Sequence, residues 1–226
     1  NYDYFILRRN NSEGVTEYYV DNDTNIFDAA EITAQVPTYV PSRIELMTGS
    51  ATENLLCLVN GNRTEMFVYK FFWQNKEKVQ SAWQKFTFNR EIVSIGFIES
   101  DLYVITKDTT DTFLEVLPME NDLQDAELTY TILLDSRIDG SALTTSFSGG
   151  VTTISGFPYD PTGVEIYSKA GHKYAFTRTS ATEGTVSGDI TSVPFFAGIP
   201  YNMLYRFSDQ TLKQPTERGG RSASVS

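Results

Sequence analysis

Short apolar runs alternate with polar breaks along the chain, most clearly between residues 43 and 120. Each run has about the length of a β-strand, and the gaps hold the Asn, Gly, Asp and Lys residues that favour turns. The pattern therefore predicts antiparallel strands joined by short turns. The predicted strands are Ile44–Met47, Leu55–Val59, Met66–Trp73, Ala82–Phe88, Ile92–Ile98, Leu102–Thr106 and Phe113–Leu117.

The N-terminal pattern predicts strands at Tyr4–Arg9 and Val15–Val20. The segment Ile26–Val36 is the best helix candidate, because Asn25 could cap it and Pro37 would stop it. Its Thr and Val content also permits an extended strand.

The composition changes after about residue 138, where Gly, Ser, Thr and Pro replace Leu. We expect four parts: 1–42 with N-terminal strands and a connecting segment, 43–138 with propeller-like blades, 139–205 as a small β domain with long loops, and 206–226 as a basic, turn-rich segment. Further strands are expected at Leu128–Leu134, Val151–Ile154, Val164–Tyr167, Tyr174–Thr177, Thr185–Val186, Pro194–Ala197 and Tyr201–Phe207.

A weak internal repeat supports the blade interpretation. A shift of 47 residues aligns residues 55–70 with residues 102–117, and apolar positions coincide more often than expected by chance. This spacing is near that of a four-stranded propeller blade. Because a propeller typically closes with about 4–8 blades, we expect any further blades to lie outside these residues.

Composition agrees with a β-rich fold. The chain has 226 residues, of which 40% are hydrophobic and 13% aromatic. Aromatic and β-branched residues suit a pleated, half-buried surface. The predicted fold class is therefore all-β, a partial β-propeller of blade-like four-stranded antiparallel sheets with a smaller β domain and little helix.

The chain offers few residues for catalysis. Its single cysteine, Cys57, lies in an apolar run and is expected to be a buried, inert thiol. The one histidine, His172, lies in a polar turn. One His and one Cys argue against a zinc or copper site. We therefore predict no catalytic residues, no metal site and no cofactor.

Acidic residues dominate the charge. The net charge of −11 argues against a module that grips DNA phosphates. The carboxylate pairs Glu99/Asp101 and Asp108/Asp111 could serve a glycosidase, but solvated turn carboxylates are far commoner. The segment Asp21–Asn25 resembles the start of a calcium loop without its Gly and Glu, so a turn is expected.

Aromatic residues are densest between Phe67 and Phe88. Trp73 and Trp83 could form an exposed platform for sugar or protein, but cross-strand packing of two paired strands is the favoured interpretation. No apolar stretch approaches the roughly 20 residues that span a bilayer, so no membrane anchor is predicted. The chain starts without Met and ends without a terminal element, so we expect a piece of a longer protein.

Several motifs resemble the tail tubular protein B, or tail nozzle, family of short-tailed bacteriophages. Residues 78–88, KVQSAWQKFTF, are similar to a "QsAW" signature of that family. Residues 28–37, 39–41, 101–104 and 198–201 resemble its other conserved runs, although Glu31 replaces the usual Asp. The matching structural residues are Asp28, Thr33, Pro37, Pro41, Gln80, Ser81, Ala82, Trp83, Leu102, Tyr103 and Glu115.

The resemblance implies a structural virion protein of the phage tail. It implies a ring of six copies below the tail adaptor protein, with a lumen that conducts double-stranded DNA and an outer surface for tail fibres. It carries no catalytic, metal or cofactor residues. Acidic residues facing the lumen would let DNA slide. The alternative is a carbohydrate-binding or depolymerising tail domain, and another is an unrelated host-surface β protein.

Overall fold

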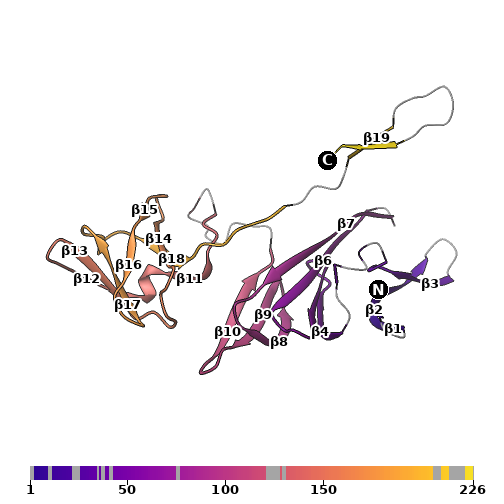
Figure 1. Cartoon of the computed structure of the whole chain (residues 1–226), viewed down its shortest axis with the longest axis horizontal. Helices are drawn as coiled ribbons and strands as arrows, with labels where there is room; N and C mark the ends of the chain where they lie inside the picture. The colour runs from indigo at the N-terminus through magenta and orange to yellow at the C-terminus, as the bar shows by residue number, and fades with distance from the viewer. Residues whose placement is uncertain are drawn as a thin grey trace. The chain divides into compact units, whose positions relative to one another are not determined.

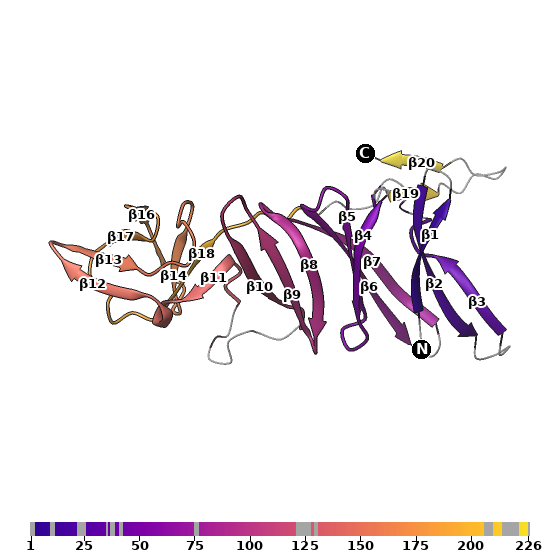
Figure 2. The same cartoon turned by 90° about the horizontal axis from the view of Figure 1, so that it is seen from below.

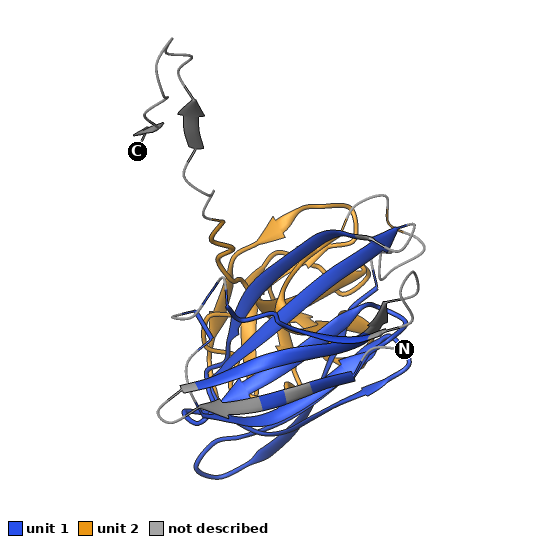
Figure 3. Cartoon of the chain, turned by 90° about the vertical axis from the view of Figure 1, so that its right-hand side faces the viewer, with its two compact units in different colours: residues 1–126 blue, residues 127–226 orange. Residues whose placement is uncertain are grey.

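The fold is taken from a computed structural model. It describes residues 3–9, 12–21, 26–34, 36, 39–40, 43–74, 77–120, 128, 131–205, 210–213 and 222–225. The chain forms two compact units, unit 1 (residues 1–126) and unit 2 (residues 127–226), which are coloured separately in Figure 3. This division falls earlier than residue 138, where the composition changes. No helix in the described ranges is long and apolar enough to cross a membrane.

Unit 1 begins with a three-stranded antiparallel sheet in the order β1-β2-β3. Its strands are β1 (Asp3–Arg9), β2 (Ser12–Asp21) and β3 (Ile26–Glu31). The helix predicted over Ile26–Val36 is therefore wrong, and the extended alternative is correct up to Glu31. Pairing of β3 with β2 along its whole length, together with the Tyr18–Phe27 ring stack, outweighs the helix propensity of the two alanines.

A four-stranded antiparallel meander follows, in the order β4-β5-β6-β7 (Figure 1). Its strands are β4 (Ile44–Ser50), β5 (Leu55–Asn60), β6 (Glu65–Gln74) and β7 (Glu77–Thr87). Every residue of β5 is buried, because both faces of this central strand are covered. Leu56 and Leu58 enter one apolar cluster, whereas Leu55 and Cys57 enter the other. Successive side chains of a strand point to opposite faces, which explains this division.

The third sheet of unit 1 contains β8 (Glu91–Ile98), β9 (Asp101–Lys107) and β10 (Thr112–Pro118). The three sheets of unit 1 are therefore layered, with the β4–β7 sheet in the middle (Figure 2). One core joins it to β2 through Val15. The other joins it to β8 and β9 through Ile92, Leu102 and Val104. The strands predicted from 43 to 120 are confirmed.

The internal repeat has a structural counterpart. Val59 pairs with Met66, and the residues 47 positions later, Thr106 and Phe113, pair in the same way. A glycine stands at corresponding places of β4 and β8, at Gly49 and Gly96, and each of these strands has a bulge near its start. The two repeats share strand order and hairpin register through three strands, and their second loops, residues 61–64 and 108–111, have the same length.

The repeats pack with corresponding faces together. Leu55 and Cys57 share a core with Leu102 and Val104, which lie 47 residues later. At the edge of this core Ser100 donates a hydrogen bond to Glu53, its counterpart in the first repeat, at 2.8 Å. The two repeats therefore contribute corresponding apolar residues to the core between their sheets.

Unit 2 contains two four-stranded antiparallel sheets around one core, in the orders β11-β18-β14-β15 and β12-β13-β17-β16. The strands are β11 (Asp135–Asp139), β12 (Thr144–Ser148), β13 (Val151–Ser155), β14 (Glu165–Ser168), β15 (Lys173–Tyr174), β16 (Phe176–Arg178), β17 (Glu183–Ser187) and β18 (Phe195–Ile199). A short 3-10 helix, Gly140–Ala142, follows β11. Gly149 and Gly150, with φ of 61° and 85°, close the two-residue β12–β13 hairpin.

Some strand predictions for unit 2 are wrong. Residues 131–134 and 201–205 carry no strand, although strands were predicted over Leu128–Leu134 and Tyr201–Phe207. The strands β11 and β12 were not predicted, because their polar Asp, Ser and Thr residues give no apolar signal. A hairpin of β19 (Gln210–Lys213) and β20 (Ser222–Val225) lies in the segment expected to be turn-rich.

Candidate functional site

The residues of the nozzle-like signature lie on β7, at the edge of the β4–β7 sheet. Trp83 pairs with Tyr69 of β6, and a bulge beside Val79 shifts the register so that Lys78 pairs with Trp73. Gln80, Ser81 and Ala82 are exposed, and Trp83 is half-buried. The exposed positions stand at the sheet edge, so they are available to a neighbouring surface. Lys78 and Trp83 instead face the core shared with β2.

The half-buried Lys78 forms an ion pair with the buried Glu17 of β2. Glu17 is only 1% exposed, and its other carboxylate oxygen accepts a hydrogen bond from the Tyr4 hydroxyl at 3.0 Å. Lys78 also donates to the Tyr69 hydroxyl at 3.2 Å. A buried carboxylate is tolerated only when it is paired and hydrogen-bonded, as here. The pair therefore joins β2 of the first sheet to β7 of the second.

Three aromatic rings surround the Lys78 ammonium. Its Nζ lies 5.2 Å from the ring centroid of Trp73, 5.5 Å from that of Tyr69 and 5.8 Å from that of Phe71. Cations are attracted to ring faces within about 6 Å. Burial alone would lower the pKa of Lys78, but its hydrogen bonds to Glu17 and Tyr69 more than offset burial and raise the pKa. Lys78 therefore stays charged inside this cage.

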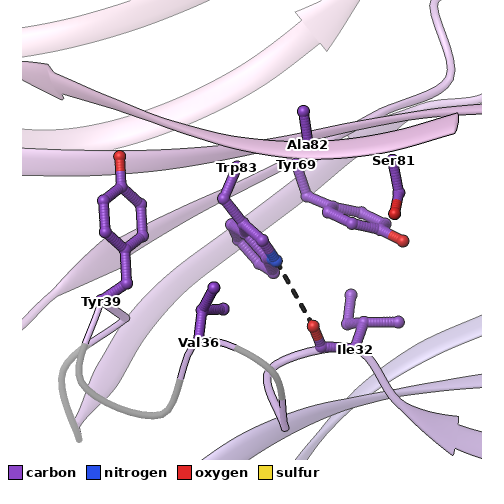
Figure 4. A pocket seen from close by; sticks show the side chains of 7 residues that line it. All are labelled: Ile32, Val36, Tyr39, Tyr69, Ser81, Ala82 and Trp83. Atoms are coloured by element: carbon purple, nitrogen blue, oxygen red, sulfur yellow. Dashed lines mark hydrogen bonds between the residues drawn. The ribbon is translucent and has the colours of Figure 1, made fainter. Parts of the chain in front are cut away.

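Trp83 closes the neighbouring hollow, which is shown in Figure 4. Its indole N–H donates to the Ile32 carbonyl at 3.3 Å, and its ring lies 4.8 Å from that of Tyr69. The hollow has a volume of about 240 Å³ and is open to solvent. Burial raises the pKa of Tyr39 at its rim. The lining residues are Ile32, Val36, Tyr39, Tyr69, Ser81, Ala82 and Trp83.

The structure gives local roles to Thr33 and Asp28. Thr33 is buried, and its hydroxyl accepts a hydrogen bond from the Val15 backbone N–H at 3.0 Å. Asp28 is exposed and accepts from the Tyr19 hydroxyl at 3.1 Å. Thr33 therefore fastens the turn after β3 to β2. Two further motif residues, Pro37 and Pro41, lie outside the described residues.

The second repeat holds the remaining motif residues. Leu102 is fully buried in the core between the two repeats. Glu115 accepts hydrogen bonds from Thr106 at 2.7 Å and from Arg90 at 3.1 Å. Tyr103, its side chain half-buried, lies on the opposite face of the sheet from Leu102. The structure thus places the motif residues at several packing positions of unit 1 and does not gather them into one cleft.

The residues considered for catalysis pack in the core or close turns. Burial raises the pKa of the Cys57 thiol to about 12, so the thiolate nucleophile is scarce. Asp108 accepts hydrogen bonds from the backbone N–H groups of Thr110 and Asp111, which lower its pKa and close the β9–β10 turn. Within the described ranges, no group of three or more His, Cys, Asp or Glu side chains is arranged to hold a metal ion.

The Lys78–Glu17 pair was missed, because the two residues are far apart along the chain and neither stands out among the other charges. Lys78 opens the signature run and lies among strands rich in aromatics, which is the feature that could have indicated a cage. Its partner on β2 is visible only in the fold.

These features define a layered β-structural protein whose motif residues hold its sheets together. Residues 1–226 match the family model described as "Bacteriophage nozzle protein". The chain therefore belongs to the bacteriophage nozzle protein family, which places it in the virion tail and confirms the resemblance.

A comparison with curated proteins gives the same family. The chain is 28% identical over 239 aligned residues to the tail tubular protein gp12 of Escherichia phage T7. The alignment covers 97% of this chain and 30% of that relative. The chain thus spans less than a third of the length of the relative that it matches.

Proposed function

We propose that this chain forms part of the wall of a phage tail nozzle, as a structural component without catalytic activity. The observation that carries the proposal is the family match over residues 1–226, joined to the way the signature residues are used. Lys78 and Trp83 hold two β-layers together, which is the role expected of a wall element. Trp73 and Trp83 both pack against the core between these layers, so neither supports the alternative of an exposed sugar-binding platform.

The proposed assembly is a ring of six copies of the full-length protein. The ring would adjoin the tail adaptor protein, meet tail fibres with its outer surface and let double-stranded DNA pass without specific binding. The net charge of −11 supports a lumen that repels phosphates. A ring whose lumen is lined mainly by Lys and Arg would contradict that part of the proposal.

A propeller is proposed for the full-length protein. The β4–β7 meander has the strand number and order of a blade, and a propeller closes with about 4–8 such sheets. The domain limits 43–138, for the propeller-like part, and 139–205, for the small β domain, stand as predictions. A structure of the full-length protein in which β4–β7 is not a blade would overturn this assignment.

The assembly is tested by light scattering and electron microscopy of the full-length protein. We expect a closed ring with six-fold symmetry and a central channel. A full-length protein that stays monomeric at every concentration, and also in the presence of its adaptor protein, would overturn the proposal. The 226-residue chain serves as a comparison, because it shows whether these residues suffice for association.

A further inference from the structure

The two repeats of unit 1 differ in what covers their outer faces. In the first repeat, the face that includes Leu58 and Phe67 is covered by the β1–β3 layer, and both side chains are 1% exposed or less. The corresponding residues of the second repeat, 47 positions later, are Ile105 and Leu114. Leu114 is 67% exposed. The position that Phe67 occupies in the core of the first repeat is therefore on the surface in the second, while Ile105 is half-buried.

Exposed and half-buried apolar side chains gather on this outer face of the β8–β10 sheet. Leu114 lies opposite Ile105, and Val116 lies opposite Tyr103, so these four side chains share one face of the sheet. Ile98, which is 62% exposed, lies on the same face of β8, two residues after Gly96. We call these five residues, Ile98, Tyr103, Ile105, Leu114 and Val116, the outer β8–β10 face.

The surroundings of this face resemble those of an interface. At one end, Lys107 pairs with Glu91 at 3.2 Å, so a charged rim borders the apolar centre. In the middle, a Cβ added to Gly96 would meet no atom within 4 Å. A Cβ added to its counterpart Gly49 would instead meet the Leu55 carbonyl oxygen at 3.2 Å and Leu56 Cδ1 at 3.9 Å. The face thus leaves room for a side chain from another layer.

We propose that the outer β8–β10 face is covered by a further β-layer from the same full-length polypeptide, supplied by residues outside 1–226. The first repeat sets the example, because the layer on its corresponding face comes from the same chain. The chain matches only 30% of the T7 relative's length, so the family has ample polypeptide for such a layer. The proposal rests on family membership and does not depend on ring assembly.

Thiol labelling at position 114 tests this assignment. The variant Leu114→Cys is made in the 226-residue chain and in the full-length protein, and labelling of the peptide around position 114 is followed by mass spectrometry. Thr110→Cys, in the exposed β9–β10 turn, is the matched control. The native thiol of Cys57 is buried and does not interfere.

We expect both introduced thiols to react at similar rates in the 226-residue chain. In monomeric full-length protein, labelling at position 114 should slow by at least about tenfold, whereas labelling at position 110 should not. If Leu114→Cys prevents folding, Val116→Cys, at a position 46% exposed, replaces it.

Three outcomes would overturn the proposal. The thiol at position 114 could react equally fast in both proteins, which would mean that no layer covers the face. It could already be protected in the 226-residue chain, which would mean that these residues cover it themselves. It could be protected only after full-length subunits associate, which would assign the face to a neighbouring subunit. Each outcome is distinct from failure to form a ring.

Discussion

Units 1 and 2 place their charged groups differently. Unit 1 holds the buried carboxylate of Glu17 against the half-buried Lys78 between two sheets, with aromatic rings around the ammonium. Unit 2 keeps ion pairs such as Arg178–Asp160 on the surface of its two-sheet core. A buried pair loses much of its Coulomb energy to desolvation, but removing one partner leaves an unpaired charge. The contrast suggests that unit 1 uses charge to fix how its layers align, whereas unit 2 depends on apolar packing and turns.

The largest difference in stability between the two units should follow from removing the charged partner of a buried carboxylate. Lys78→Met leaves the carboxylate of Glu17 buried without its partner and should cost about 3–5 kcal/mol of unfolding free energy. Urea unfolding followed by tryptophan fluorescence measures it, because both tryptophans of the chain, Trp73 and Trp83, lie in unit 1.

The control is Lys173→Met, which removes the solvent-exposed partner of Glu165 in unit 2. Hydrogen exchange of unit 2 peptides should show no measurable change, because exposed pairs contribute little. The double variant Glu17→Leu/Lys78→Met should recover much of the loss. Equal effects of the two lysine substitutions would contradict the comparison.

Truncating a core residue of the first repeat and its surface counterpart in the second should change the free energy of unfolding by very different amounts. Phe67→Ala removes a ring from the core between the first two sheets and should cost about 3–5 kcal/mol. Leu114→Ala, at the corresponding position of the second repeat, should change the stability of the 226-residue chain by less than about 0.5 kcal/mol. Urea unfolding measures both. A large loss for Leu114→Ala in this chain would show that its face is already covered.

Close packing in unit 2 gives a smaller effect. A Cβ added to Gly184 would lie 2.2 Å from the Phe176 ring, so Gly184→Ala should destabilise unit 2 by about 1–3 kcal/mol. Gly96→Ala in unit 1 adds the same methyl group to open space and should be neutral or slightly stabilising. Thermal unfolding with hydrogen exchange assigns each change to its unit. Similar effects at both positions would contradict the packing of β16 on β17.

The smallest expected effect is on how the stability of unit 2 depends on pH in the acidic range. Burial alone would raise the pKa of Asp139, but hydrogen bonds from Ser141 and Lys169 lower it from 3.8 to about 2. A lowered pKa stabilises the fold above the unfolded value, so this contribution is full above about pH 4 and is lost as the pH falls towards 2. Asp139→Asn should therefore flatten the acid dependence of unit 2 in that range. An unchanged pH profile would argue against the Lys169 contact.

Much of unit 1 could be predicted from the sequence, because its strands are marked by apolar runs. The apolar run Leu55–Val59 predicted the strand β5, whereas the shared hairpin register of the two repeats is seen only in the structure. β11 and β12 could not be predicted, since polar residues such as Asp135 and Thr144 give no apolar signal, and the partner of β11, β18, is also distant along the chain. The helix expected at Ile26–Val36 was wrong because pairing with β2 decides the conformation of this segment.

The candidate site was predictable only in part. The signature run and the packing interpretation of Trp83 followed from the sequence, whereas the edge position of the strand that carries them is seen only in the fold. The meeting of Lys78 with Glu17 did not, because it depends on how two sheets stack. The open face around Leu114 also needed the structure, since apolar residues in a strand do not show which face is covered.

A reconstruction of the phage tail by cryo-electron microscopy tests the central claim most directly. The account predicts that units 1 and 2 are found in a ring around the tail axis, as part of the wall that encloses the DNA channel. Density that placed them away from the channel wall, for example in a peripheral fibre, would contradict it.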